Sequence, residues 1–240
     1  MLRPITVPFR LLLFAFLCAS FLPVNAGNPD NWIRESYKCA ILDAMVAESA
    51  EICDSLIAIN KRNPKLTWND ADYREWLLVV TWTKYADSYP LDDTLLTSWG
   101  NTWVTVVPEI QTWFLKHDIP DTLIAVRCRQ LLGLPPTGEY THFVELWVQP
   151  SDLFRPSPDS EIGDSRAELA FPAAAEPDYR KWFEENIRDS YFPMHYPWTR
   201  LGYTYDWGGD SSEIGLSEFV IRKAARVIVH SKFLTLDYLQ

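Results

Sequence analysis

The sequence lacks the motifs that usually identify an enzyme or a metal protein. Its four histidines are widely spaced without an H-x-x-x-H pair, and no two cysteines form a C-x-x-C pair. A zinc or iron site would therefore need ligands from distant parts of the chain. No G-x-S-x-G or S-x-x-K motif offers a serine nucleophile. We expect no metal site of this kind and no cofactor.

Calcium stays an open alternative, because two segments that are predicted to be loops are rich in carboxylates. One loop holds Asp159, Glu161 and Asp164, and the other holds Asp206, Asp210 and Glu213. Calcium takes oxygen ligands from flexible loops, but neither segment has the residue order of an EF-hand. Two solvated acidic loops would produce the same pattern.

Long apolar runs are absent after residue 26, but one lies before it. Arg3 and Arg10 precede an apolar stretch of 12 residues at 11–22, and Ala26 completes a cleavage site of small residues. A membrane-spanning helix needs about 20 apolar residues. We therefore predict a signal peptide over 1–26, export to the periplasm or medium after cleavage near Ala26, and no transmembrane segment in the mature chain. The absence of an N-x-S/T glycosylation site fits a bacterial origin.

Basic residues are scarce relative to acidic ones. The chain has 22 Lys and Arg against 32 Asp and Glu, a formal net charge of −10. The predicted leader holds two arginines and no acidic residue, so its removal changes the net charge to −12. A surface this acidic repels phosphate backbones and anionic lipid. We expect a soluble protein without a nucleic-acid partner, and a glycan, peptide or protein of the cell envelope stays open as a partner.

Cysteine is also scarce, with only Cys39, Cys53 and Cys128 after the predicted leader. An oxidising compartment favours one disulfide among them. Cys39 and Cys53 would lie about 21 Å apart on one straight helix, far beyond disulfide reach. We therefore predict a bridge from Cys128 to Cys39 or Cys53. The alternative, a nucleophilic Cys128 assisted by His142, has no family signature around it.

The first half of the chain carries apolar residues at helical spacing. This pattern predicts amphipathic helices over 31–60, 70–86 and 121–132, and a further helix over 92–114. Pro108 should kink or split the helix at 92–114, because proline lacks the backbone donor. The expected result is about four helices over 27–136.

The second half has a different texture. Tyr140–Val148 alternates like a strand, residues 151–165 read as a loop, and a short helix is expected after Pro177. Residues 191–209 are irregular but rich in aromatics, and 216–238 fits a β-hairpin better than a helix. We therefore predict an α+β fold, in which a helical half (27–136) packs on a small antiparallel, loop-rich half (137–240) in a single domain.

Four residues are candidates for acid–base catalysis, namely His142, Asp152, Asp206 and Glu218. A glycoside hydrolase uses two carboxyl groups, one as the acid and the other as base or nucleophile, often beside aromatic rings. His142 and Glu145 cannot form a direct pair, because strand positions three apart point to opposite faces. A structural role is the alternative for each of them.

Six residues are candidates for ligand binding, namely Arg155, Trp198, Arg200, Tyr203, Tyr205 and Trp207. The rings could stack on a sugar or peptide, and the arginines could hold an anionic group. The alternative is that Tyr205 and Trp207 fix a glycine-rich loop to the core. Two hypotheses follow: an envelope binding or interaction protein, or a secreted hydrolase that cleaves envelope glycan or peptide polymers by carboxylate/His acid–base catalysis.

Overall fold

The computed structural model describes residues 29–70, 74–192 and 194–240, so the predicted signal peptide at 1–26 lies outside the described residues. Eight strands form one sheet in the order β3-β10-β5-β2-β4-β9-β6, with β1 paired to β2. These strands are β1 (Trp68–Asn69), β2 (Trp76–Thr83), β3 (Thr94–Leu96), β4 (Thr102–Val106), β5 (His142–Val148), β6 (Leu153–Phe154), β9 (Phe219–Ile221) and β10 (Arg226–Leu234). Every pairing is antiparallel.

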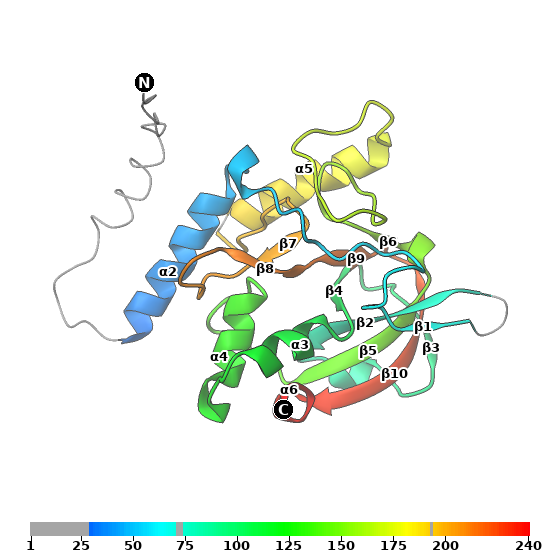
Figure 1. The fold of residues 1–240 in the computed structure, drawn as a ribbon, viewed down its shortest axis with the longest axis horizontal. Coiled ribbons are helices and arrows are strands. Elements are labelled where there is room, and N and C mark those ends of the chain that lie inside the picture. Colours follow the sequence, from blue (N-terminus) through cyan, green and yellow to red (C-terminus); the bar gives the residue numbers. More distant parts are fainter. Residues whose placement is uncertain (1–28, 71–73, 193) are drawn as a thin grey trace, which may run out of the picture.

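Helices surround this sheet and a separate two-stranded sheet formed by β7 (Tyr203–Tyr205) and β8 (Ile214–Ser217) (Figure 1). The α-helices are α2 (Pro29–Ala44), α3 (Glu109–Lys116), α4 (Asp121–Leu131), α5 (Pro177–Tyr191) and α6 (Thr235–Leu239). Among the described residues, short 3-10 helices are η1 (Ser49–Glu51), η3 (Ala86–Ser88) and η4 (Pro150–Asp152). None of the helices in the described ranges is long and apolar enough to cross a membrane.

The prediction of a helical first half is wrong, because four strands lie between residues 68 and 106. The segment 76–83, predicted as part of a helix, is the central strand β2, and seven of its eight residues are buried. A strand that is buried on both faces has a continuous apolar run, so its spacing also fits a helical stripe. Its valines and threonines favour the extended form.

The other predicted elements have mixed outcomes. The helix predicted over 31–60 ends at Ala44, and Ile57 and Ile59 instead pack as extended chain in the core against β2 and β5. The predictions of α4, β5 and α5 are confirmed. Pro108 does precede a new helix, α3. The segment 216–238 is mostly strand, but β9 and β10 pair with other strands and form no hairpin.

Two apolar layers cover the two faces of β2 and β5. On one face, Val79 and Leu146 pack with β10 and the extended segment near Ile57. On the other face, Leu78, Val80 and Phe143 meet helices α3, α4 and α6. A third cluster joins α2 and α5 to Phe154 and Val220 on β6 and β9. These clusters hold the sheet against helices from both halves of the sequence.

The sheet opens between β2 and β4. These strands pair only at Val79 with Val106 and at Val80 with Thr105. Beyond this point, the end of β2 stays paired with β5, while the start of β4 pairs with β9. The strands therefore diverge, and side chains rather than backbone hydrogen bonds line the gap. This opening leaves room for a cavity between the two strands.

Candidate functional site

A cavity of about 460 Å³ lies where β2 and β4 diverge. Residues 80–83 of β2, Asn101 and residues 102–105 of β4 form one part of its wall. The second half of the chain contributes α5, the loop at 195–198, β7 and Glu218, and residues 132–134 after α4 also line it. The volume falls within the range of small-molecule sites, which is about 300–1,000 Å³.

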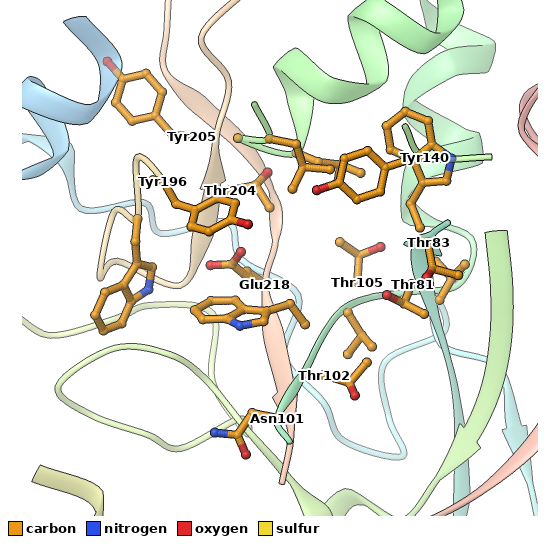
Figure 2. A pocket seen from close by; sticks show the side chains of 18 of the residues that line it. Thr81, Thr83, Asn101, Thr102, Thr105, Tyr140, Tyr196, Thr204, Tyr205 and Glu218 are labelled. Carbon is orange, nitrogen blue, oxygen red and sulfur yellow. The ribbon is translucent and has the colours of Figure 1, made fainter. Parts of the chain in front are cut away.

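Polar side chains without hydrogen-bond partners are concentrated in this cavity. Within the described part of the chain, no hydrogen bond forms from the side chains of Thr81, Thr105, Tyr140 or Tyr196, all of which line it. In Figure 2, the two phenol oxygens are directed toward the interior of the cavity. The amide nitrogen of Asn186 is also buried without a partner. The four hydroxyl groups can therefore bind a ligand in the cavity, and the buried Asn186 nitrogen is unusual because buried polar groups normally have partners.

Glu218 is the most unusual of the lining residues. It lies between β8 and β9, where its backbone N–H donates to the carbonyl oxygen of Gly202 at 2.9 Å. Alternation along an extended chain directs its side chain away from those of Ser217 and Phe219, and its carboxyl group reaches into the cavity (Figure 2). No described side chain donates a hydrogen bond to it. Burial alone raises the pKa of the Glu218 carboxyl well above its usual value.

Aromatic rings supply most of the apolar wall. Trp103 and Trp198 meet edge to face with centroids 6.1 Å apart, and Trp82 stacks on Tyr140 at 4.9 Å. Tyr196 is 42% exposed, so its ring lies where the cavity meets solvent. Packed rings of this kind give a rigid wall that offers faces and edges to a ligand.

Two other buried glutamates contrast with Glu218, because both have hydrogen-bond donors. Glu145 on β5 accepts from Ser231 Oγ and from Tyr238 Oη at 2.9 Å. Glu109, at the start of α3, accepts at Oε1 from the backbone N–H and the hydroxyl of Ser217. Neither glutamate lines the cavity. These two are structural acids, whereas Glu218 faces space that a ligand can enter.

Of the four predicted catalytic residues, only Glu218 lines the cavity. Asp206 forms a bidentate pair with Arg127, at 2.7 Å and 2.5 Å. His142 lies at the start of β5, with Nδ1 2.9 Å from the hydroxyl of Thr141. Asp152 lies in η4, and burial raises the pKa of its carboxyl. The four residues are therefore not assembled around this cavity.

Of the six predicted binding residues, Trp198 and Tyr205 line the cavity. The Tyr205 hydroxyl points out of the cavity (Figure 2). It donates a hydrogen bond to Asp43 Oδ2 at 2.8 Å. Trp207 is buried and donates from its indole to the carbonyl oxygen of Leu134. Tyr203 is buried and donates to the carbonyl oxygen of Glu51. Trp207 and Tyr203 thus fix loops to the core.

Both predicted binding arginines are held by the protein itself. Arg155 is fully buried and donates to the carbonyl oxygens of Glu161, Ile57 and Asp164, the last at 2.7 Å. Arg200 donates to the carbonyl oxygen of Met45 at 2.8 Å. Neither arginine lines the cavity. Their contacts join segments that are far apart in the sequence.

The predicted disulfide is not formed in the structure. Cys53 and Cys128 are free thiols, and they lie in different core clusters. The expectation assumed one helix over 31–60, but this helix ends at Ala44, so Cys53 lies in an irregular segment instead. Burial raises the pKa of the Cys128 thiol well above its usual value, which opposes a nucleophilic role. Among the described residues, no group of three or more His, Cys, Asp or Glu could hold a metal ion.

Sequence reasoning missed most of the cavity residues. Thr81 and Thr83 lie two positions apart, a spacing that places both on one face of a strand, but the segment was predicted as a helix. Asn186 and Tyr196 carry no pattern that sets them apart from ordinary surface residues. The opening between β2 and β4 depends on strand pairing between distant segments, which composition and periodicity do not reveal.

The chain matches no protein-family model, no curated protein and no solved structure.

Proposed function

We propose that this chain is an exported binding protein of the cell envelope that holds a ligand in the cavity between β2 and β4. The observation that carries the proposal is the concentration of polar side chains without partners among aromatic rings in a cavity of about 460 Å³. The ligand is a small molecule, or the end of a glycan or peptide whose terminal unit enters the cavity. The leader-like segment at 1–26 supports the location.

A binding role fits the site better than catalysis, because the cavity does not bring the predicted acid–base residues together. Asp206 is neutralised by Arg127, and His142 and Asp152 lie outside the lining. Glu218 is the only carboxyl group of the predicted set that a ligand in the cavity could touch. One unpaired acid among rings can orient a ligand without a second catalytic group.

The test fills the cavity and measures binding. The variant Thr81→Trp places an indole where a half-buried threonine lines the cavity, and Thr94→Trp on β3 is the control, with an exposed threonine on a strand outside the lining. We expect purified peptidoglycan, glycans or envelope peptides to bind the unmodified protein and the Thr94→Trp protein. Thr81→Trp should lose this binding while its circular dichroism spectrum stays unchanged. Equal binding by all three proteins would refute the cavity as the site.

A secreted hydrolase is the second candidate, favoured by the raised pKa of Glu218. A raised pKa favours the protonated form of a carboxyl group, and this form can act as a general acid. Asp189 and His195 also line the cavity and are exposed, so either could be the second group. Release of soluble fragments from peptidoglycan or peptide substrates, lost in Glu218→Gln, would favour the hydrolase. Retention without release would favour the binding protein.

A further inference from the structure

The charged residues that line the cavity are all acidic except for one histidine. They are Asp189, Glu218 and His195, and within the described residues no lysine or arginine is among them. Asp189 and His195 are exposed, whereas Glu218 lies deeper and has no hydrogen-bond partner. The electrostatic potential in the cavity is therefore expected to be negative, and to become more negative when Glu218 ionises. An anionic ligand would meet no lysine or arginine among the described lining residues.

Cations near the surrounding elements are engaged elsewhere. Arg127 is paired with Asp206 and lies over the Trp113 ring at 4.5 Å. Arg129 donates to the carbonyl oxygen of Gly138 at 3.1 Å. Neither residue lines the cavity. The described residues thus supply no counter-ion to Glu218, and a desolvated carboxylate without one is costly.

The rings around Glu218 suit a cation as well as an apolar body. Trp103, Trp198, Tyr140 and Tyr196 all line the cavity, and a ring face attracts an ammonium group through its quadrupole. In Figure 2, Tyr196 lies on the same side of the cavity as Glu218. A carboxylate together with aromatic faces is the combination that recognises amines.

Building on the proposed function, we infer that the cavity binds an organic ammonium cation, with the Glu218 carboxylate as its counter-ion and the aromatic rings as its walls. The ligand is a primary or quaternary amine on an apolar body of a size that fits about 460 Å³. It can be a free amine or the amine-bearing end of a peptide or glycan. The phenols of Tyr140 and Tyr196 and the amide of Asn186 are free to bind polar groups on the same ligand.

Binding should be coupled to proton release. Burial raises the pKa of Glu218, which favours the protonated carboxylic acid in the ligand-free cavity. A cation within about 4–6 Å favours the carboxylate, so the Glu218 proton leaves to solvent as the amine enters. The other titratable groups with side chains on the lining are Asp189, His195 and the phenols.

The experiment compares matched ligands by isothermal titration calorimetry on protein purified from the full chain. Phenethylamine is compared with phenethyl alcohol, and choline with its uncharged carbon analogue. Titrations at pH 8 in buffers of different ionisation enthalpy report the protons released. The variants are Glu218→Gln, which keeps the shape but cannot ionise, and Glu109→Gln, a buried carboxyl outside the lining. Thermal unfolding verifies that each variant is folded.

We expect the amines to bind more tightly than their neutral partners, with net proton release wherever the ligand-free Glu218 carboxyl is protonated. Glu218→Gln should weaken amine binding by on the order of 30-fold or more and abolish the proton release, as expected when one partner of a desolvated charge pair is removed. Glu109→Gln should change neither. Equal affinity for amines and alcohols, unchanged binding by Glu218→Gln, or no binding of either amine would each overturn the inference.

The outcomes also separate this inference from the proposed function. If neutral glycans or peptides bind and Thr81→Trp abolishes that binding, the cavity is a binding site for neutral ligands, and only the amine inference fails. If neither amines nor envelope polymers bind the protein, both fail. Binding of an amine that persists in Thr81→Trp would place the amine outside the cavity and would refute the inference.

Discussion

The Glu109 carboxyl should make the protein less stable as the pH rises. Glu109 begins α3, and its Oε1 accepts from the Ser217 N–H at 3.1 Å and from the Ser217 hydroxyl at 2.9 Å, whereas Oε2 is buried without a partner. Burial raises the pKa of Glu109 from 4.5 to about 7, against the opposing effects of Ser217, Lys65 and Arg155. Between pH 4.5 and about pH 7, the native state therefore holds a proton on Glu109 that the unfolded chain has already lost.

The size of the effect follows from proton linkage. Because the folded-state pKa is the higher one, the contribution of Glu109 is fully present below pH 4.5 and is lost as the pH rises to about 7. Each pKa unit corresponds to about 1.4 kcal/mol, so between pH 5 and pH 8 the loss is about 2.5 kcal/mol. This is a large part of a typical free energy of unfolding, which is about 5–15 kcal/mol.

The variant Glu109→Gln tests this reasoning, because an amide oxygen can accept both Ser217 hydrogen bonds and cannot ionise. We expect its free energy of unfolding, relative to the unmodified protein, to increase by about 2.5 kcal/mol between pH 5 and pH 8. Urea denaturation followed by tryptophan fluorescence at several pH values measures it. Glu185→Gln on α5 is the control, because it removes one exposed negative charge. A stability difference that does not change with pH would refute a raised Glu109 pKa.

Three further perturbations have defined outcomes. Arg127→Ala should lower the free energy of unfolding by about 3–5 kcal/mol in urea titrations, because it leaves Asp206 buried without its bidentate partner, and a loss below 1 kcal/mol would contradict this role. Gly202→Ala should destabilise by about 1–3 kcal/mol by the same measurement, because φ is +75° and a Cβ would lie 2.7 Å from Arg155 Cδ. Cys128 should react with a thiol reagent only after unfolding, and rapid labelling of the native protein would contradict its complete burial.

Helix and strand predictions succeeded where the local signal was unambiguous. The segment 121–132 begins with an acidic residue and ends before Gly133, and α4 covers Asp121–Leu131. Gly133 has φ +65°, the left-handed conformation that ends a helix. The strand at 142–148 alternates, and its two faces point to different apolar clusters, as expected. Such signals depend on residues close in the sequence, so they can be read without knowing the fold.

Prediction failed where long-range pairing decides the structure. The residues of β2 have apolar spacing that fits a helix or a strand, and pairing with β5, between positions 59 to 71 residues apart, determines that the segment is a strand. Phe219 and Val227 both lie in strands, as predicted, but they pair with different neighbours, so the hairpin was wrong. Errors of this kind place whole elements incorrectly and so hide any site that is built between them.

For the candidate site too, local sequence signals were informative and long-range contacts were not. Glu218 was nominated from its aromatic neighbours, Tyr203, Tyr205 and Trp207, yet two of these three rings only fix loops. The partners that matter on the cavity wall, such as Thr105, come from the first half of the chain. A single sequence gives no signal for this meeting, because β4 and the β8–β9 corner are more than 100 residues apart.

The two acids beside the β8–β9 corner show why Glu218 is better explained by a ligand than by the fold. Desolvation raises the pKa values of both Glu109 and Glu218, so ionisation of either acid opposes folding above its usual pKa. Glu109 offsets part of this cost with two hydrogen bonds that connect α3 to Ser217. Glu218 forms no such connection, so a glutamine or a leucine would stabilise the protein more. An acid that weakens the fold and faces a cavity is consistent with a role in binding, which the ligand titrations test.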